Sequence, residues 1–221
     1  QIRYLHYQVR KLVDGVSLIK QNIVLMELNN IFPELNDEHN FIFIDKFDKH
    51  KYYKGVNLFT DFNINDIESN TKWDCKLQTN FPGKDIGLLN PNFVNKLFDD
   101  ILLFLQKEIK KHNIKWLKNI VYSSKNLGWY NIYKKGFSQE RHFHRGDGNI
   151  LSGVYYYKSP SKIRFYNPKD TKSDFGIDFQ PEEGNIILFS NLLEHSVPVY
   201  NGEDIRISFA FNLGIREKYE N

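Results

Sequence analysis

The C-terminal half of this 221-residue chain contains six short runs with the character of β-strands, and these runs constrain the fold more than any other feature. Each run is rich in β-branched and aromatic residues, and Pro, Gly, Asn and Asp separate the runs. The runs are WLKNIVYSS (116–124), GWYNIYKKG (128–136), LSGVYYYK (151–158), KIRFYNP (162–168), NIILFS (185–190) and DIRISFAFNL (204–213). So many short strands within about a hundred residues predict an antiparallel sandwich or barrel.

An amphipathic helix is predicted directly before these strands, in NPNFVNKLFDDILLFLQKEIKKHN (90–113). Asn90 is suited to the N-cap position, and Pro91 is suited to the first position of the helix. Apolar residues recur at helical spacing and form one face, namely Phe93, Val94, Leu97, Ile101, Leu102, Phe104, Leu105 and Ile109. We expect this face to pack on the outside of the β structure.

The residues before the helix give weaker signals. Residues 1–30 carry apolar positions that suggest a broken helix or two short elements, and FIFIDKF (41–47) alternates as a strand does. Residues 48–90 are polar, with turn signals. We therefore expect an N-terminal α+β extension over 1–89 that packs on a core formed by 90–221, as a single structural unit.

Charge and composition exclude several classes of partner. The net charge is only +3 and no basic stripe is visible, so neither nucleic acid nor a membrane surface is expected as a partner. Cys75 is the single cysteine, which rules out a disulfide within the chain and favours a reducing compartment. No apolar run approaches the roughly 20 residues that span a bilayer, and no signal-peptide pattern is found. These observations together favour the cytoplasm.

The last predicted strand has two different faces. Ile205, Ile207, Phe209, Phe211 and Leu213 point to one side, whereas Arg206, Ser208, Ala210 and Asn212 point to the other. An Arg that faces a barrel interior needs an anion, because an unpaired buried charge is costly. That anion is either the carboxylate of a ligand, bound by the guanidinium fork, or an Asp or Glu of the chain. This strand alone does not decide between the two.

Three histidines are candidate metal ligands. His142 and His144 stand two residues apart in RHFHRGDGN (141–149), and His195 lies just beyond the predicted strand 185–190. Each histidine alone could equally be an ordinary strand or loop residue with no ligand. Together with Arg206 and Ser208 they suggest a mononuclear site, because such sites are built from a few donors on different strands at a barrel mouth.

Several segments resemble the iron- and 2-oxoglutarate-dependent dioxygenases, in particular bacterial and phage proteins related to prolyl hydroxylases. The segments are YKKGFSQERHFH, LSGVYYYKSP, IRFYNP, PEEGNIILFSNLLEHSVPV and RISFAFN, within residues 125–214. KWDCKLQT (72–79) and the long helix resemble that group less specifically. The order is the specific part: Tyr-x-x-Gly, a His six residues after that Gly, Ser-Gly-Val-Tyr-Tyr, Gly-x-x-x-x-Phe, His, and Arg-x-Ser.

The resemblance implies a mainly β fold with flanking helices, whose core is a double-stranded β-helix (a cupin-like jelly roll) with Fe(II) in its mouth. It implies His142 and His195 as iron ligands, with His144 at the position where the family usually has a carboxylate. Three neutral imidazoles would leave the iron more positive than two imidazoles and a carboxylate. Asp147 is the alternative carboxylate, and a third option is a degenerate, inactive site.

The resemblance also implies 2-oxoglutarate and O2 as cosubstrates. Arg206 and Ser208 match the residues that bind the distal carboxylate, and Tyr156 and Asn131 lie on strands that often supply further hydrogen bonds. The implied reaction converts 2-oxoglutarate to succinate and CO2 and hydroxylates a C–H bond of a peptide, a protein or a small molecule, in a bacterial or phage-infected cell.

Two other functions stay open at this point. One is a three-His, cupin-like metal-binding protein or a dioxygenase that does not use 2-oxoglutarate. The other is a non-enzymatic interaction domain on a decayed oxygenase fold. The pair Arg206 and Ser208 separates the first of these from a 2-oxoglutarate enzyme, because a three-His enzyme has no need of a carboxylate fork on that strand.

Overall fold

The computed structural model describes residues 42–47, 69–70, 77–79, 89–112, 120–122, 128–144, 149–158, 160–167 and 172–217. This part of the chain is mainly β, with one helix, as predicted. The elements expected within residues 1–30 lie outside the described residues, as do Cys75 and Asp147. The division of the chain at residue 89 stays a prediction.

The described strands form two antiparallel sheets, here called the major and the minor sheet. The major sheet has the order β1-β10-β7-β12-β5-β3-β2, with β4 paired to β12, and the minor sheet has the order β6-β11-β8-β9. The strands of the major sheet are β1 (Ile42–Lys46), β2 (Ser69–Asn70), β3 (Leu77–Thr79), β4 (Ile120–Tyr122), β5 (Trp129–Tyr133), β7 (Asn149–Lys158), β10 (Asn185–Ser190) and β12 (Arg206–Glu217). Those of the minor sheet are β6 (Gln139–His142), β8 (Ile163–Tyr166), β9 (Gly176–Phe179) and β11 (His195–Val197).

From β5 onward the chain passes back and forth between the two sheets. Strands β5, β7, β10 and β12 lie in the major sheet, and β6, β8, β9 and β11 lie in the minor sheet. Eight antiparallel strands shared in this way between two sheets make a jelly roll, the double-stranded β-helix expected from the sequence. All six predicted runs contain strands, and β6, β9 and β11 are additional to them.

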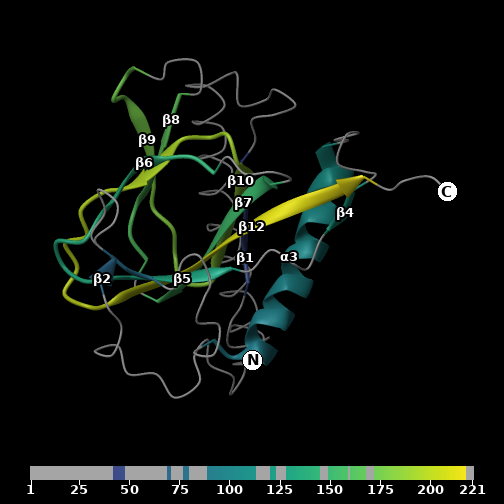
Figure 1. The fold of residues 1–221 in the computed structure, drawn as a ribbon, viewed down its shortest axis with the longest axis horizontal. Coiled ribbons are helices and arrows are strands. Elements are labelled where there is room, and N and C mark those ends of the chain that lie inside the picture. The colour runs from purple at the N-terminus through teal and green to yellow at the C-terminus, as the bar shows by residue number, and fades with distance from the viewer. Residues whose placement is uncertain are drawn as a thin grey trace, which may run out of the picture.

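Helix α3 (Pro91–His112) covers the outer face of the major sheet. Its first turn is capped as predicted, because the side-chain Oδ1 of Asn90 accepts from the backbone N–H of Asn92 at 3.0 Å. Figure 1 shows α3 on one side of the long strand β12 and the strands β6, β8 and β9 on the other. The buried helix residues Phe93, Leu97, Ile101, Phe104, Leu105 and Ile109 form one cluster with residues of β1, β5, β7, β10 and β12.

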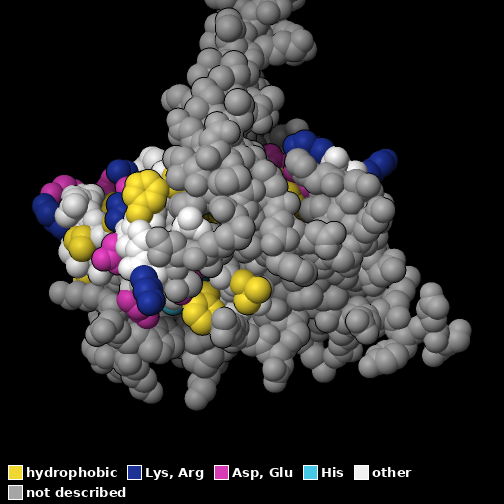
Figure 2. All heavy atoms as spheres, turned by 90° about the horizontal axis from the view of Figure 1, so that it is seen from above, with side chains coloured by type: hydrophobic (Ala, Val, Ile, Leu, Met, Phe, Trp, Pro, Cys, Tyr) yellow, Lys and Arg dark blue, Asp and Glu magenta, His cyan; other side chains and the backbone are white. Residues whose placement is uncertain are grey.

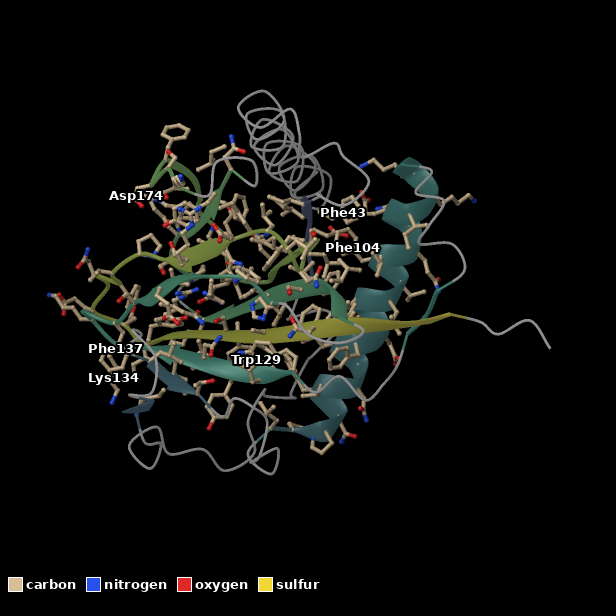
Figure 3. All side chains as sticks on the ribbon, turned by 45° about the horizontal axis from the view of Figure 1, so that its top comes forward. Phe43, Phe104, Trp129, Lys134, Phe137 and Asp174 are labelled. Atoms are coloured by element: carbon tan, nitrogen blue, oxygen red, sulfur yellow. The ribbon has the colours of Figure 1, made fainter. Side chains whose placement is uncertain are left out.

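The two faces of β12 have the different surroundings that the sequence predicts. Ile207, Phe209, Phe211 and Leu213 belong to the cluster under α3, whereas Arg206 and Ser208 line a cavity between the sheets. The same alternation holds on β7, where Tyr155 belongs to the cluster and Tyr156 lines the cavity. Figure 3 shows Phe104 of α3 beside Phe43 of β1 in this core. The helix therefore supports the sheet from behind, and the polar face of the sheet is directed into the jelly roll.

On the face seen in Figure 2, Lys and Arg side chains lie next to Asp and Glu side chains among the described residues. Some of the neighbouring opposite charges of the protein form ion pairs, such as Arg164 with Asp178 on the minor sheet. Of the described helices, none is long and apolar enough to cross a membrane.

We expect Leu105→Ala to lower the free energy of unfolding by about 2–5 kcal/mol, because this side chain is fully buried between α3 and the sheet. Leu103→Ala makes the same change on the same helix at a side chain that is 64% exposed, and should cost less than about 0.5 kcal/mol. Urea unfolding of both variants checks this. Equal effects would mean that the helix packs through another face.

Candidate functional site

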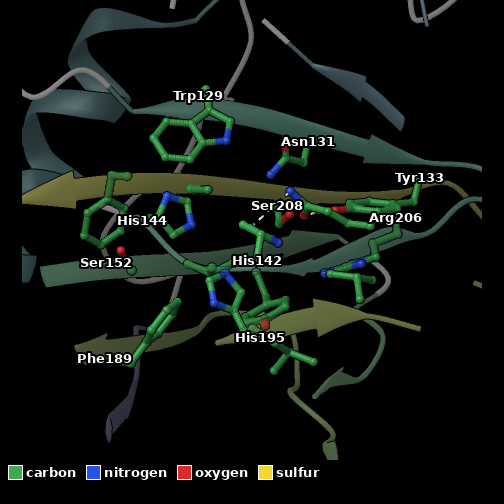
Figure 4. A pocket seen from close by; sticks show the side chains of 18 residues that line it. Trp129, Asn131, Tyr133, His142, His144, Ser152, Phe189, His195, Arg206 and Ser208 are labelled. Carbon is green, nitrogen blue, oxygen red and sulfur yellow. Dashed lines mark hydrogen bonds between the residues drawn. The ribbon is translucent and has the colours of Figure 1, made fainter. Parts of the chain in front are cut away.

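A cavity opens between the two sheets, lined by residues of both. Figure 4 shows His142, His144 and His195 toward one end of it and Arg206 with Tyr133 at the other, with Asn131 and Ser208 in between. Of the lining residues that the structure describes, none is Asp or Glu. The cavity thus combines three imidazoles and one guanidinium without a described acidic group.

The jelly roll places two of the histidines directly opposite each other. His142 ends β6, His195 begins β11, and the two residues are paired across the antiparallel ladder. Their ring centroids are 4.3 Å apart. The sequence placed His195 just beyond β10, but it starts a short strand of the other sheet, because the intervening turn crosses between the sheets.

Both of these rings are oriented by the backbone in the same way. Nδ1 of His142 lies 2.8 Å from the carbonyl oxygen of Glu140, and Nδ1 of His195 lies 3.0 Å from that of Leu193. A neutral ring that donates from Nδ1 keeps its lone pair on Nε2. Each ring therefore presents a ligating nitrogen, and its partner is a backbone carbonyl two residues earlier.

His144 is held by a different set of contacts. Its backbone N–H donates to the carbonyl oxygen of Asn191 at 2.9 Å, and the side-chain amide of Asn191 donates to the His144 carbonyl at 3.2 Å. The ring packs against Trp129, with centroids 5.8 Å apart, and stacks on His195 at 5.2 Å. Asn191 therefore ties the segment after β6 to the turn after β10.

All three imidazoles are held in the neutral form. Burial lowers the pKa of His142 below its usual value, while the hydrogen bond to Glu140 acts in the opposite direction. Burial, followed by the proximity of His142, lowers the pKa of His144 to about 4. Burial lowers the pKa of His195 well below its usual value, and the two neighbouring rings add to that effect. Neutral imidazoles are the form that binds metals.

The donor set fits a divalent metal ion. One ring nitrogen from each of the three histidines lies within 4.8 Å of the other two. Imidazole nitrogens suit iron, zinc, copper and nickel. His144 is thus brought together with His142 and His195, as the sequence suggested, whereas the alternative Asp147 lies outside the described residues.

Arg206 lies at the opposite end of the cavity and is 1% exposed. Its Nε and one terminal nitrogen are buried and have no hydrogen-bond partner among the described residues. The guanidinium carbon stands 4.2 Å from the ring centre of Tyr133, and no ion pair to a described Asp or Glu forms. The alternative of a structural salt bridge therefore finds no support in the described part of the chain.

The other predicted site residues form one row across three neighbouring strands. Ser208 on β12 pairs with Asn131 on β5 and with Tyr156 on β7. All three side chains are buried and line the cavity. The Tyr156 hydroxyl has no hydrogen-bond partner among the described residues, and burial raises the pKa of this group, so it remains a donor. The row thus offers polar groups beside the guanidinium.

Several cavity or support residues were not singled out from the sequence, among them Trp129, Tyr133, Gln139 and Asn191. Tyr133 pairs with Arg206 across β5 and β12, which strand parity could have indicated, because Asn131 and Tyr133 share a face. The position of Gln139 depends on a shift of register between β6 and β11, which no feature of the sequence predicts.

Residues 166–212 match the model of one family, described as "Putative 2OG-Fe(II) oxygenase". This range contains His195, Arg206 and Ser208. The match covers less than half of the chain and lies within its C-terminal part, which is therefore similar to the 2OG-Fe(II) oxygenase family. That family implies Fe(II) and 2-oxoglutarate as cofactor and cosubstrate, and the three-imidazole site is where this chain could bind a metal.

Solved structures of such enzymes resemble this chain at low identity. A 2OG-Fe(II) oxygenase family oxidoreductase from Burkholderia pseudomallei matches with 15% identity and a TM-score of 0.35, over 41% of this chain and 42% of that chain. A Pseudomonas putida prolyl-4-hydroxylase matches with 15% identity and a TM-score of 0.45, over 69% and 79%. A Trichoplax adhaerens prolyl hydroxylase, in complex with a hypoxia inducible factor peptide fragment, matches with 14% identity and a TM-score of 0.49, over 90% and 92%. No curated protein matches the chain.

An ion pair fastens the two strands that carry His142 and His195. Arg141 and Glu194 each precede one of these histidines, and Nε of Arg141 donates to the Glu194 carboxylate at 2.6 Å. Arg141 also donates to the carbonyl oxygen of Ser173 at 2.7 Å and lies over the ring of Tyr166. The ion pair therefore ties the β6 and β11 ends at the point where their histidines face each other.

We expect Arg141→Gln to weaken the binding of Ni²⁺ about tenfold, because the two histidines lose a contact that sets their separation. Isothermal titration of Ni²⁺ measures this. Arg164→Gln is the matched control, since Arg164 forms a similar ion pair with Asp178 on the same sheet, away from the histidines. Equal losses in both variants would show a general effect on the sheet instead.

Proposed function

We propose that this protein is an Fe(II)- and 2-oxoglutarate-dependent hydroxylase of a C–H bond in a peptide, a protein or a small molecule. His142, His144 and His195 hold the iron, and Arg206 binds the distal carboxylate of 2-oxoglutarate, assisted by Ser208, Tyr156 and Asn131. The observation that carries this proposal is the buried guanidinium of Arg206, which faces a cavity without a described acidic group.

A dicarboxylate fits the two ends of this cavity. Its distal carboxylate supplies the anion that a buried guanidinium requires, through a charge-assisted fork. The hydroxyl groups of Tyr156 and Ser208 lie in the neighbouring row and can donate to the same oxygens. The three imidazoles occupy the other end, so a bound metal and the guanidinium can hold opposite ends of one small ligand.

When bound, iron and 2-oxoglutarate would supply the oxidation by O2, with succinate and CO2 as further products. The contribution of the chain is binding and shielding. The imidazoles hold the metal without adding charge, because their low pKa values keep them neutral at pH 7. Phe189 packs edge-on against His195 with centroids 4.8 Å apart, and Trp129 covers His144, so apolar rings keep water from two ligand sites.

The alternative function is a three-His metal protein that does not use 2-oxoglutarate. The absence of a carboxylate from the metal-ligand group in the described residues favours it. That alternative leaves the buried Arg206 without an anion, which is energetically costly. We therefore prefer the 2-oxoglutarate enzyme.

The test of this preference is an anaerobic titration of the protein with Fe(II), with and without 2-oxoglutarate. Chelation of iron by the cosubstrate gives a weak visible charge-transfer band. In Arg206→Met we expect the affinity for 2-oxoglutarate to fall about thirtyfold or more, with metal affinity retained, because a buried charge partner is removed. Arg164→Met, on the minor sheet, is the control. Metal binding without the band in the wild-type protein would favour the three-His alternative.

The role of His144 has its own test. We expect His144→Ala to lower metal affinity at least tenfold, and His144→Asp to retain it, because a carboxylate is an adequate ligand for iron. His195→Ala provides the reference for the loss of a ligand. Metal titration of the three variants decides the question. Unchanged metal affinity in both His144 variants would exclude His144 as a ligand and point to Asp147.

A further inference from the structure

Gln139 lines the same cavity as His142, although the two residues are three positions apart on strand β6, which is an odd spacing. In a regular strand, residues at odd spacing point to opposite faces. The ladder between β6 and β11 is irregular here: His142 pairs with His195 and Gln139 pairs with Val197, so three steps on β6 match two on β11. Such a bulge re-aims a side chain, and here it turns Gln139 toward the histidines.

The carboxamide of Gln139 is oriented by two hydrogen-bonding groups. The Tyr133 hydroxyl donates to Oε1 at 2.9 Å, and Nε2 lies 3.4 Å from Nε2 of His142. Because Nδ1 of His142 donates to Glu140, its Nε2 carries the lone pair and accepts. The amide N–H of Gln139 therefore points at the atom that would bind a metal.

This arrangement predicts which hydrogen-bond acceptor the Gln139 amide would find when a metal is bound to His142. With a metal bound, the lone pair of His142 Nε2 would be engaged, and the N–H of Gln139 would lose this acceptor. A buried donor without an acceptor is costly. The nearest new acceptor is an oxygen atom of whatever organic ligand binds beside His142 at the metal.

Tyr133 connects this amide to the other end of the cavity. Its hydroxyl holds Gln139, while its ring lies against the guanidinium of Arg206 at 4.2 Å. The turn between β5 and β6 makes this possible, because Gly136 adopts a left-handed φ of 82° there. Arg206, Tyr133, Gln139 and His142 thus form one continuous wall from the carboxylate fork to the metal ligands.

We propose that Gln139 is a cosubstrate-binding residue, whose amide N–H donates to an oxygen atom at the 2-oxo acid end of 2-oxoglutarate. Arg206 binds the far carboxylate and Gln139 binds the near end, with Tyr133 fixing the separation between them. This inference rests on the proposed function, because it concerns the same cosubstrate. It assigns to Gln139 the recognition of the 2-oxo acid group, and to Tyr133 the positioning of Gln139.

The test separates metal binding from cosubstrate binding. Isothermal titration first measures Ni²⁺ binding, and then measures 2-oxoglutarate binding to the Ni²⁺-loaded protein, which does not turn over. For Gln139→Leu we expect Ni²⁺ affinity equal to or higher than that of the wild type, because the amide no longer competes for His142. We expect 2-oxoglutarate affinity to fall about tenfold, as for a lost hydrogen bond to a charged group.

Two further variants complete the design. Gln139→Asn keeps the amide but withdraws it by one methylene, and should also weaken 2-oxoglutarate binding without weakening Ni²⁺ binding. Gln180→Leu makes the same chemical change at an exposed glutamine whose side chain, among the described residues, bonds the carbonyls of Pro160 and Pro181, and should change neither affinity. Tyr133→Phe keeps the ring beside Arg206 and should weaken 2-oxoglutarate binding less than Gln139→Leu does.

The outcomes distinguish this inference from the proposed function. If the wild-type protein binds 2-oxoglutarate and both Gln139 variants bind it equally well, the role of Gln139 is refuted and the proposed function stands. If Gln139→Leu and Gln139→Asn lose Ni²⁺ as well, Gln139 merely supports His142 and the inference fails. If the Ni²⁺-loaded wild type does not bind 2-oxoglutarate, the proposed function fails, and the inference fails with it.

Discussion

The buried charge of Arg206 is the constraint on which the rest of the site depends. A guanidinium that is 1% exposed needs an anion or a dense set of acceptors, and the described side chains around it supply aromatic rings and hydroxyl donors instead. The strand that carries it cannot turn this face outward, because its other face packs under α3 through Phe209 and Phe211. The core thus fixes the charge in the cavity, where the proposed cosubstrate would supply the anion.

The jelly roll places the guanidinium and the three histidines at opposite ends of one cavity. Its major sheet supplies the guanidinium and the polar row from three adjacent strands, whereas its minor sheet supplies His142 and His195 from the ends of β6 and β11. Each sheet is held by its own contacts: the helix packs behind the major sheet, and the Arg141–Glu194 ion pair joins the strands of the minor sheet. Cosubstrate binding and metal binding can therefore be altered separately by mutation.

Local sequence signals predicted the parts of this structure that depend on local physics. The Asn90 cap, the apolar face of α3 and the alternation along β12 all follow from periodicity and side-chain chemistry, and the structure confirms each. Gln139 was missed because strand parity places it away from His142, and only the pairing with β11 creates the bulge. Asn191 was missed for a similar reason, since its contact with His144 joins segments that are 47 residues apart.

The charge balance of the cavity suggests why metal and cosubstrate binding should depend on each other. Three neutral imidazoles leave the two positive charges of a divalent ion uncompensated, and Arg206 adds a third positive charge. The described lining residues include no Asp or Glu to offset them. A dianionic 2-oxo acid supplies most of the missing negative charge, so each of the two should strengthen the binding of the other, and by linkage the two effects are equal. A carboxylate ligand at the metal would reduce this coupling. The proposed His144 ligand would therefore make the metal site depend more on its cosubstrate for charge neutrality.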